Sequence, residues 1–330
     1  MKKVTLKDIA VVTGLSVNSV SRALKDKDSI SAETRKMVQE AAKKMGYIPN
    51  SLASSMRSGK TYSIAVILGE IVNPYNAHLL NNLTTRLHDA GYTLLVFVTN
   101  QRRSLEDSAV QNAISKNVDA LVACTQLKPD NMELIRGLGI PFLQIGLVST
   151  TPEFCQVSKD EYHAGYLAAR HLLEKGHRRI LHIVFPQKYF AFSGERTRGF
   201  RQAYEEAGVP FDEGLLYTYY RENTIQRILE QAAEKSPGFT AITAGNDMLA
   251  WQVIETLRNQ GFRVPEDYAV VGFDDLRSFI RVPYRLTSAA SNLSDLSRRA
   301  VEILMAQLDD PQASPRVYVE TTYLVEGEST

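Results

Sequence analysis

The chain has 330 residues, of which 44% are hydrophobic and 23% are charged, and this length is large for a single buried core. Its formal net charge of +1 is unevenly distributed: residues 1–60 carry 12 basic and 5 acidic side chains, a net of +7, whereas the other 270 carry 26 and 32, a net of −6. Two cysteines exclude a disulfide framework, and no apolar stretch reaches the ~18 residues of a membrane span.

Residues 5–24 predict two short helices joined by a tight turn. Thr5 and Asp8 can bond the free amide groups at the start of the first helix, and Gly14 fits the left-handed residue that ends it. The apolar face of this helix is predicted to consist of Ile9, Ala10 and Val12.

The second helix is predicted to start at its cap, Ser16, and to bury Val20 and Leu24, which are one turn apart. Its outward-pointing residues are then Val17, Asn18, Ser21 and Arg22. A short polar helix held by a second helix suits the major groove of DNA, and the basic charge of this region favours that interpretation. The alternative is a small helical hairpin with no role in DNA binding.

Two more segments follow before the composition changes. Ser31 and Thr34 open a third predicted helix, which Gly46 ends. Pro49 then forces its predecessor out of helical geometry, and Asn50 can cap residues 51–60, about two turns of marginal helix. A segment this short is expected to fold only when it meets a partner.

These residues carry a resemblance that spans nearly the whole chain, from Val4 to about Leu324. The specific motifs, in order, are T-L-K-D-I-A, G-L-S-V-N-S-V-S-R-A-L, G-Y-I-P-N-S-L-A, G-H-R-R-I, N-D-M-L-A and V-P-E-D-Y-A-V-V-G-F-D-D. In this order and spacing, the chain resembles the lactose-repressor/galactose-repressor (LacI/GalR) family of bacterial transcription regulators.

The resemblance implies that the chain binds an operator in double-stranded DNA. In that family the second helix reads bases, and the segment after Tyr47 becomes a hinge helix in the minor groove. Met56 falls at the position of an apolar wedge that unstacks a central base step, where the family usually has leucine. The full predicted DNA-binding set is Thr5, Ser16, Val17, Asn18, Ser21, Arg22, Ser31, Thr34, Asn50, Ala53 and Met56.

From residue 61 the pattern alternates between strands and helices, which predicts parallel sheets with helices on both faces. The strands are expected at 62–68, 93–99, 120–124, 142–145, 180–185, 215–220, 241–244 and 268–272. The helices are expected at 75–89, 104–116, 132–136, 162–175, 195–207, 224–235 and 247–260. The fold class is therefore α/β, with an all-helical head.

The domain organisation is predicted as a helix-turn-helix head (1–49), a hinge helix and linker (50–60), and a two-lobed body (61–330). The resemblance implies a periplasmic-binding-protein-like body with three crossing segments, near 158–160, 288–292 and 320–323. An N-lobe of about 61–159 and 292–321 and a C-lobe of about 160–291 and 322–330 follow from these crossings.

An enzyme is the rival class. The sequence contains no G-x-x-x-x-G-K-[ST] phosphate loop, no H-E-x-x-H and no G-x-S-x-G. His171, His177 and His182 are close in sequence, but they fall on a helix, its exit turn and the next strand, so no metal site and no cofactor are expected. Asp274 and Asp275 end a strand without an evident acid or nucleophile partner, and binding is their better role.

Ligands of open α/β sheets sit beyond the carboxyl ends of the strands. In the family, the matching effector contacts are an arginine before Gly-Phe, an Asn-Asp pair and the aspartate of Gly-Phe-Asp. The predicted effector-binding residues are Tyr75, Phe192, Arg196, Tyr220, Asn246, Asp247 and Asp274. The structural alternatives are a helix cap for Asp247, a loop brace for Asp274 and lobe packing for the aromatic residues.

Aromatic rings with Asn, Asp and Arg suit a sugar, whereas Tyr189–Ser193 lacks the basic and hydroxyl residues that precede the matching arginine in purine-responsive relatives. A sugar, a sugar phosphate, a nucleoside and a partner protein remain open, as does the choice between inducer and co-repressor. Met1-Lys2-Lys3 leads into no apolar signal segment, so a cytoplasmic protein is expected. The sequence shows no helical tail of the kind that tetrameric members carry, which favours a homodimer.

Overall fold

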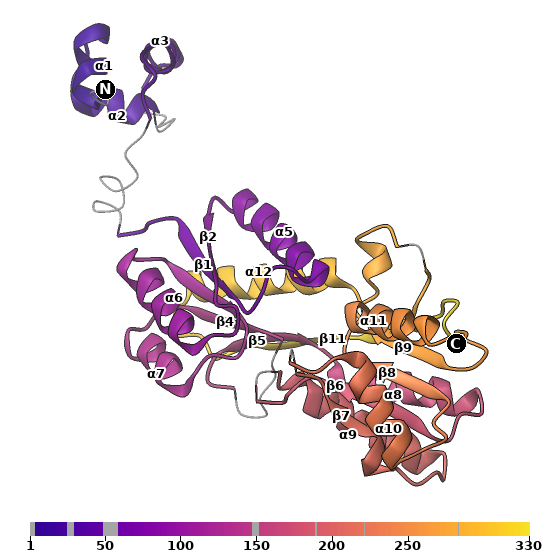
Figure 1. The fold of residues 1–330 in the computed structure, drawn as a ribbon. Coiled ribbons are helices and arrows are strands. Elements are labelled where there is room, and N and C mark those ends of the chain that lie inside the picture. The colour runs from indigo at the N-terminus through magenta and orange to yellow at the C-terminus, as the bar shows by residue number, and fades with distance from the viewer. Residues whose placement is uncertain are drawn as a thin grey trace. The chain divides into compact units, whose positions relative to one another are not determined.

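The computed structural model describes residues 4–24, 30–48, 59–146, 152–188, 190–220, 222–282 and 284–330. The chain forms two compact units, Met1–Thr61 and Tyr62–Thr330, and each has a hydrophobic core of its own (Figure 1). Three predicted DNA-binding residues, Asn50, Ala53 and Met56, lie outside the described ranges.

The first unit contains three helices, α1 (Leu6–Thr13), α2 (Val17–Leu24) and α3 (Ala32–Met45). Its core is built from six buried residues, Ile9, Ala10, Val20, Ala23, Val38 and Ala42. The prediction that Val12 lies on the apolar face is wrong, since its side chain is 63% exposed. On α1 the inward positions follow the helical spacing Leu6, Ile9, Ala10, Thr13, and Val12 falls on the opposite side.

The predicted caps of these helices are present. Thr5 and Asp8 form a capping box: the Thr5 N–H donates to Asp8 Oδ2 at 2.8 Å and Thr5 Oγ1 accepts from the Asp8 N–H at 3.4 Å. Gly14 ends α1 in the left-handed region, at φ 70°. Ser16 accepts from the Ser19 N–H, and Ser31 from the Thr34 N–H.

The second unit is built on two six-stranded sheets. The sheet of the N-lobe has the order β11-β5-β4-β3-β1-β2 and is parallel throughout. Its strands are β1 (Ser63–Leu68), β2 (Thr93–Val98), β3 (Ala120–Cys124), β4 (Phe142–Ile145), β5 (Cys155–Lys159) and β11 (Val317–Glu320).

The sheet of the C-lobe has the order β12-β10-β9-β8-β6-β7. Its strands are β6 (Ile180–Val184), β7 (Leu216–Thr218), β8 (Ala241–Ala244), β9 (Ala269–Phe273), β10 (Thr287–Ser291) and β12 (Thr322–Val325). The edge strand β12 pairs antiparallel with β10, which is an exception to the predicted parallel arrangement.

Helices cover both faces of each sheet because strand residues alternate between the faces. In the N-lobe, Ile64, Val66 and Leu68 pack under α5 (Pro74–Asp89) and α12 (Leu293–Asp309), whereas α6 (Arg103–Ser115) and α7 (Pro129–Gly137) cover the other face. In the C-lobe, α8 (Glu161–Glu174) and α9 (Phe192–Glu206) cover one face and α10 (Ile225–Lys235) and α11 (Asp247–Asn259) the other.

Most predicted elements of the body differ from the observed ones by one or two residues at their ends. Two differences are larger: α7 begins at Pro129 instead of Met132, and α9 begins at Phe192 instead of Glu195. Pro129 fits the first turn of a helix, where its missing N–H is not needed. Because α9 begins at Phe192, this residue lies on a helix and not in a loop.

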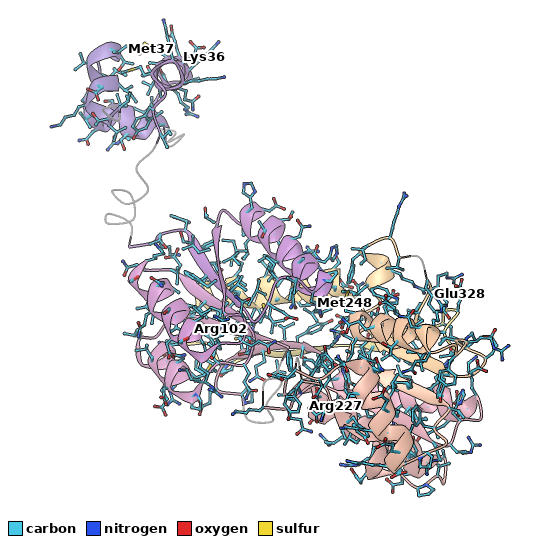
Figure 2. The ribbon with its side chains drawn as sticks, in the orientation of Figure 1. Lys36, Met37, Arg102, Arg227, Met248 and Glu328 are labelled. Carbon is cyan, nitrogen blue, oxygen red and sulfur yellow. The ribbon has the colours of Figure 1, made fainter. Side chains whose placement is uncertain are left out.

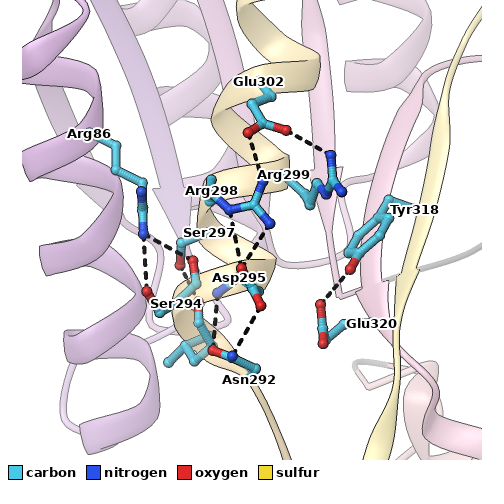
Figure 3. A network of polar contacts seen from close by, with 11 residues as sticks. Arg86, Asn292, Ser294, Asp295, Ser297, Arg298, Arg299, Glu302, Tyr318 and Glu320 are labelled. Atoms are coloured by element: carbon cyan, nitrogen blue, oxygen red, sulfur yellow. Dashed lines mark hydrogen bonds and ion pairs between the residues drawn. The ribbon is translucent and has the colours of Figure 1, made fainter.

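The chain passes between the sheets after β5, after β10 and after β11. Figure 3 shows how the passage from β10 into α12 is held. The Asn292 side chain accepts from the Asp295 N–H at 3.1 Å, and Arg86 of α5 donates to Ser294 O and Oγ at 3.2 and 3.0 Å. These bonds fix the start of α12 against the N-lobe.

Candidate functional site

A cavity of about 530 Å³ lies where the carboxyl ends of the strands of both sheets meet. Its wall includes the segments that follow β1, β2, β3, β4 and β5 in the N-lobe and β6, β7, β8 and β9 in the C-lobe. Met248, at the start of α11 on the side of the C-lobe that faces the N-lobe, is part of this wall (Figure 2). The position agrees with the strand-end rule for ligands of α/β proteins.

Four of the side chains that line the cavity are buried and charged. Lys159 Nζ lies 2.5 Å from Asp274 Oδ1 and 3.9 Å from Glu161 Oε1. Arg196 donates from Nε to Glu161 Oε2 at 2.7 Å and from Nη1 to the Gly245 carbonyl oxygen at 2.7 Å. The side chains are 8% exposed or less. We call Lys159, Glu161, Arg196 and Asp274 the charged quartet.

The quartet joins the two lobes. Lys159 is the last residue of β5 in the N-lobe, whereas Asp274 directly follows β9 in the C-lobe. Asp274 has a φ of 102°, a conformation that residues other than glycine seldom adopt, and its N–H donates to the Ala289 carbonyl at 3.0 Å. The local fold therefore holds this carboxylate toward the cavity in a strained backbone.

Two glycines bring the other half of the quartet together. A side chain on Gly199 of α9 would collide with the Tyr162 carbonyl of α8, and one on Gly165 of α8 would collide with the Arg196 backbone. The absence of both side chains lets α8 and α9 approach closely, which places Glu161 at the start of α8 beside Arg196 on α9.

The buried environment of the quartet shifts the pKa values of Lys159 and of the neighbouring Tyr75. Burial alone would lower the pKa of Lys159, but the Asp274 and Glu161 carboxylates override it and hold this pKa above its ordinary value. The Lys159 ammonium also lies 4.8 Å from the ring centroid of Tyr75. Burial raises the pKa of Tyr75 to about 12, so its hydroxyl stays neutral. The quartet has two formal positive and two formal negative charges.

Aromatic rings form a further part of the cavity wall. Phe185, which follows β6, has its ring centroid 5.0 Å from that of Phe190 and 6.1 Å from that of Tyr219, which follows β7. Tyr220 also lines the cavity and is 47% exposed. Phe192 connects these rings with the quartet, since its ring centroid is 6.4 Å from that of Phe185 and 4.6 Å from the Arg196 guanidinium.

Six of the seven predicted effector residues line the cavity, namely Tyr75, Phe192, Arg196, Tyr220, Asn246 and Asp274. Asn246 also caps α11, and Arg196 is engaged by Glu161 and Gly245, so both have structural roles as well. Contact of these residues with an effector stays a prediction.

Asp247 requires a correction, since it does not line the cavity. Its Oδ2 accepts from the Leu276 N–H at 2.8 Å and its Oδ1 from Ser288 Oγ at 2.7 Å, so the carboxyl group braces the loop that carries Asp274. Burial, reinforced by the charge of Asp274, raises the pKa of Asp247 to about 8. Asp247 therefore has a structural role, but not the predicted alternative of a helix cap, because Asn246 caps α11.

The sequence interpretation missed Lys159 and Glu161. One signal was present: a lysine ends the otherwise uncharged strand Cys155–Lys159, and charged residues are seldom fully buried unless they are paired. Their partners lie 115 and 35 residues away, respectively, and no local pattern connects them.

On the first unit, Val17, Asn18 and Arg22 are exposed on α2 and Ser21 is half-buried. The hydroxyls of Thr5, Ser16 and Ser31 bond backbone amides at helix starts, and Thr34 Oγ1 bonds Ser31 Oγ at 2.8 Å. The outward face of α2 thus combines an amide, a guanidinium and an apolar side chain, the groups that read base edges. DNA contact by each of these residues stays a prediction.

The histidines and cysteines do not converge. His171, His177 and His182 each bond a different threonine, Thr330, Thr240 and Thr243, and burial lowers the pKa of His182 to about 3. Among the described residues, no group of three His, Cys, Asp or Glu side chains is placed to hold a metal ion. Cys124 lines the cavity, and burial raises the pKa of its thiol to about 12.

Comparison with known proteins gives the context of both sites. Residues 5–50 match the family "Bacterial regulatory proteins, lacI family", and residues 169–330 match the "Periplasmic binding protein-like domain". The chain is 31% identical over 281 residues to the HTH-type transcriptional regulator DegA of Bacillus subtilis (strain 168). The aligned region covers 83% of this chain and 82% of DegA.

The chain belongs to the lacI family. It is thus a DNA-binding transcriptional regulator with a ligand-binding body, and the family is not one of enzymes. A solved complex of the transcriptional regulator CelR with cellobiose is 25% identical, covers 99% of this chain and 100% of its own, and has a TM-score of 0.74.

A lac repressor dimer bound to operator and the anti-inducer ONPF is 22% identical, covers 99% of both chains and has a TM-score of 0.86, so it supports the lacI-family fold. None of the described helices of this lacI-family chain has the length and apolar character needed to cross a bilayer.

Proposed function

We propose that the protein is a homodimeric transcriptional repressor whose affinity for a pseudo-palindromic operator is set by a small sugar-like effector in the interlobe cavity. The observation that carries the proposal is the cavity itself, because charged and aromatic side chains from both lobes converge on it. A ligand held there contacts both lobes at once and so can favour one lobe arrangement over another.

On the DNA side, α2 supplies the reading surface. Asn18 and Arg22 carry donor and acceptor groups that match base edges, and Val17 offers an apolar contact for a thymine methyl group. Two copies related by two-fold symmetry would read two half-sites, which is why the operator is expected to be a pseudo-palindrome. The lac repressor relative is a dimer on its operator, which supports this assembly.

The effector acts through the two lobes. The Lys159–Asp274 ion pair already spans them, so a ligand that bonds either side chain has a different free energy in each lobe arrangement. A ligand can shift operator affinity only by this difference, typically about 1–3 kcal/mol. The cellobiose bound to the relative CelR supports a saccharide as the effector.

The proposal is tested by selecting bound DNA from a random duplex pool and then screening saccharides by thermal shift. We expect a symmetric consensus with two half-sites, and at least one saccharide that raises the melting temperature and changes the affinity for that consensus. No duplex binding, or a ligand that is chemically turned over, would refute the proposal.

A further inference from the structure

A second, smaller cavity adjoins the main one where α6 and α7 of the N-lobe begin. Its volume is about 90 Å³, and a water molecule occupies about 30 Å³ in the liquid, so the cavity has room for a small ion. The two cavities share the wall residues Gln101, Thr125 and Gln126. The charged quartet does not line the second cavity.

The turn between β2 and α6 forms part of this second cavity. Asn100 and Gln101 have positive φ values of 47° and 59°, and Thr99 fixes the turn that they make. Thr99 Oγ1 accepts from the Gln101 N–H at 3.3 Å, and the Thr99 carbonyl accepts from the Arg102 N–H at 2.9 Å. The turn therefore places Gln101, Arg102 and Arg103 in the wall.

The start of α7 forms another part of the wall and is bonded to α6. Glu106 of α6 is 7% exposed, and its Oε1 accepts from the Lys128 N–H and from Asn131 Nδ2, each at 2.7 Å. Lys128 Nζ donates to Asp107 Oδ2 at 2.6 Å. The positive ends of two helix dipoles thus lie together, and neither helix has a side-chain cap.

The wall of the second cavity has an excess of positive charge. Of its described residues, Arg102, Arg103, Lys128 and Lys188 are basic and Glu106 is acidic. Lys128 is matched by Asp107, but neither Arg102 nor Arg103 is in an ion pair with another described residue. The quartet differs, because each of its cations is paired with a buried carboxylate. A concave surface with unmatched guanidinium groups favours an anion.

Lys188 makes the second cavity a junction between the lobes. It follows β6 of the C-lobe, whereas Arg102 and Arg103 belong to the N-lobe. An anion that contacts all three side chains has a lower free energy when the lobes bring them together than when the lobes separate them. Its binding therefore favours the lobe arrangement of this structure.

We infer that the second cavity binds a phosphate-sized oxyanion through Arg102, Arg103 and Lys188, and that the bound anion stabilises this lobe arrangement. The site is separate from the sugar-like effector of the proposed function, and only an effect of the anion on operator affinity rests on that function. Inorganic phosphate and the phosphate group of a small metabolite share the required chemistry.

Anion binding is tested by calorimetry on the full chain, with inorganic phosphate, sulfate and glycerol 3-phosphate at constant ionic strength and chloride as the reference. We expect phosphate and sulfate to bind with millimolar or lower dissociation constants, because several charged donors reach one anion. Glycerol 3-phosphate that binds at least tenfold more tightly than phosphate identifies a metabolite as the source, and equal or weaker binding identifies the free anion. Absence of binding by all three would overturn the inference.

The role of Arg102 is tested against a matched arginine on the other lobe. Arg227 is exposed in the first turn of α10, outside the cavity, and Thr224 caps that helix by accepting from the Arg227 N–H at 3.2 Å (Figure 2). Arg102→Gln should weaken phosphate about fivefold, whereas Arg227→Gln should not change it. Arg102→Lys keeps the charge and should restore the affinity to within about twofold of the wild type.

The role of Lys188 is tested against Lys116, an exposed lysine that ends α6 outside the cavity. Lys188→Gln should weaken phosphate about fivefold, and Lys116→Gln should have no effect. Equal losses in a variant and its control would show that phosphate responds to net charge alone, which would overturn the site.

The stabilised lobe arrangement is tested by hydrogen exchange without DNA or saccharide. Phosphate should slow exchange at residues 99–106 in the N-lobe and at 184–188 in the C-lobe, and Lys188→Gln should lose the second effect. Protection confined to one lobe would overturn the junction. Operator affinity that differs at least threefold between phosphate and chloride at equal ionic strength would extend the effect to DNA. Because calorimetry and exchange involve no DNA, failure of the proposed function would leave their outcome unchanged.

Discussion

The two units of the chain present their functional groups in opposite ways. On the first unit, Asn18 and Arg22 are exposed on the outer face of α2, above a core of six small and medium-sized residues. In the second unit, Lys159, Glu161, Arg196 and Asp274 are at most 8% exposed and are bonded to one another. DNA is a large polyanion that the protein meets at its surface, whereas a small ligand is enclosed and loses its water.

The difference has an energetic consequence. Exposed charges attract phosphates through water, and salt screens this attraction over about 10 Å at 0.1 M. Buried charges are screened far less, but removing one of them leaves its partner desolvated. The two units should therefore respond differently to ionic strength, to side-chain removal and to pH.

The largest expected effect is that of salt on operator binding. Residues 1–60 carry a net charge of +7, so the affinity for the selected operator should fall on the order of a thousandfold between 50 and 200 mM salt. The affinity of the cavity for an uncharged ligand should change less than about twofold over the same range. Fluorescence anisotropy and calorimetry on one sample series measure both. A salt-insensitive operator affinity would contradict the role of the basic unit.

The second prediction concerns Arg196. Arg196→Ala removes the partner of the buried Glu161 and one bond to the Gly245 carbonyl, and it should lower the free energy of unfolding of the second unit by about 3–5 kcal/mol. It should also abolish the ligand response while operator binding and its salt slope stay nearly unchanged. Urea unfolding and anisotropy measure the two parts.

Arg201 is the matched control on the same helix. Its ion pair with Glu213 is 2.6 Å long, but the two side chains are 48% and 64% exposed. Arg201→Ala should therefore change the free energy of unfolding by no more than about 0.5 kcal/mol and leave the ligand response intact. Equal effects of both substitutions would contradict the assignment of Arg196 to a desolvated site.

The same contrast explains which features of the two units could be predicted from the sequence. The caps Thr5, Gly14 and Ser31 are local signals within a few residues of the helices they bound, and they were predictable for that reason. Asp274 was predicted because the strand ends of an α/β sheet converge on one edge, and Arg196 because the resemblance to the family places an effector contact at that position. Lys159 and the bracing role of Asp247 were not predicted, because both depend on contacts with other loops that form only when the lobes pack.

The third prediction uses the pH dependence of Asp247. Burial and the charge of Asp274 raise the pKa of Asp247 to about 8 from an ordinary value of 3.8, so the folded state holds a proton that the unfolded chain releases. The stability that this proton contributes is complete below about pH 4 and is lost progressively as the pH rises from there through 8. Between pH 6 and 8, Asp247 should lower the free energy of unfolding by about 2 kcal/mol.

Asp247→Asn cannot ionise and should lack this slope, whatever its baseline stability. Urea unfolding of the wild type and the variant at pH 6, 7 and 8 gives the difference directly. Parallel curves would show that Asp247 is ionised throughout this range, and the bracing carboxyl group would then have to be described as a buried anion.

The last prediction tests whether an exposed residue of the first unit reads sequence. Arg22→Ala should lose about 1–3 kcal/mol of discrimination at one position of each half-site and relax the selected consensus there, because an arginine on the outer face of α2 can bond a base edge in two places. Lys36, exposed on α3, is the control of equal charge (Figure 2). Lys36→Ala removes the same charge without changing the consensus, so repeating the selection with both variants separates base reading from phosphate attraction. If Arg22→Ala weakens every sequence equally, as a lost phosphate contact does, then α2 positions the protein on DNA and the base contacts must come from elsewhere in the chain.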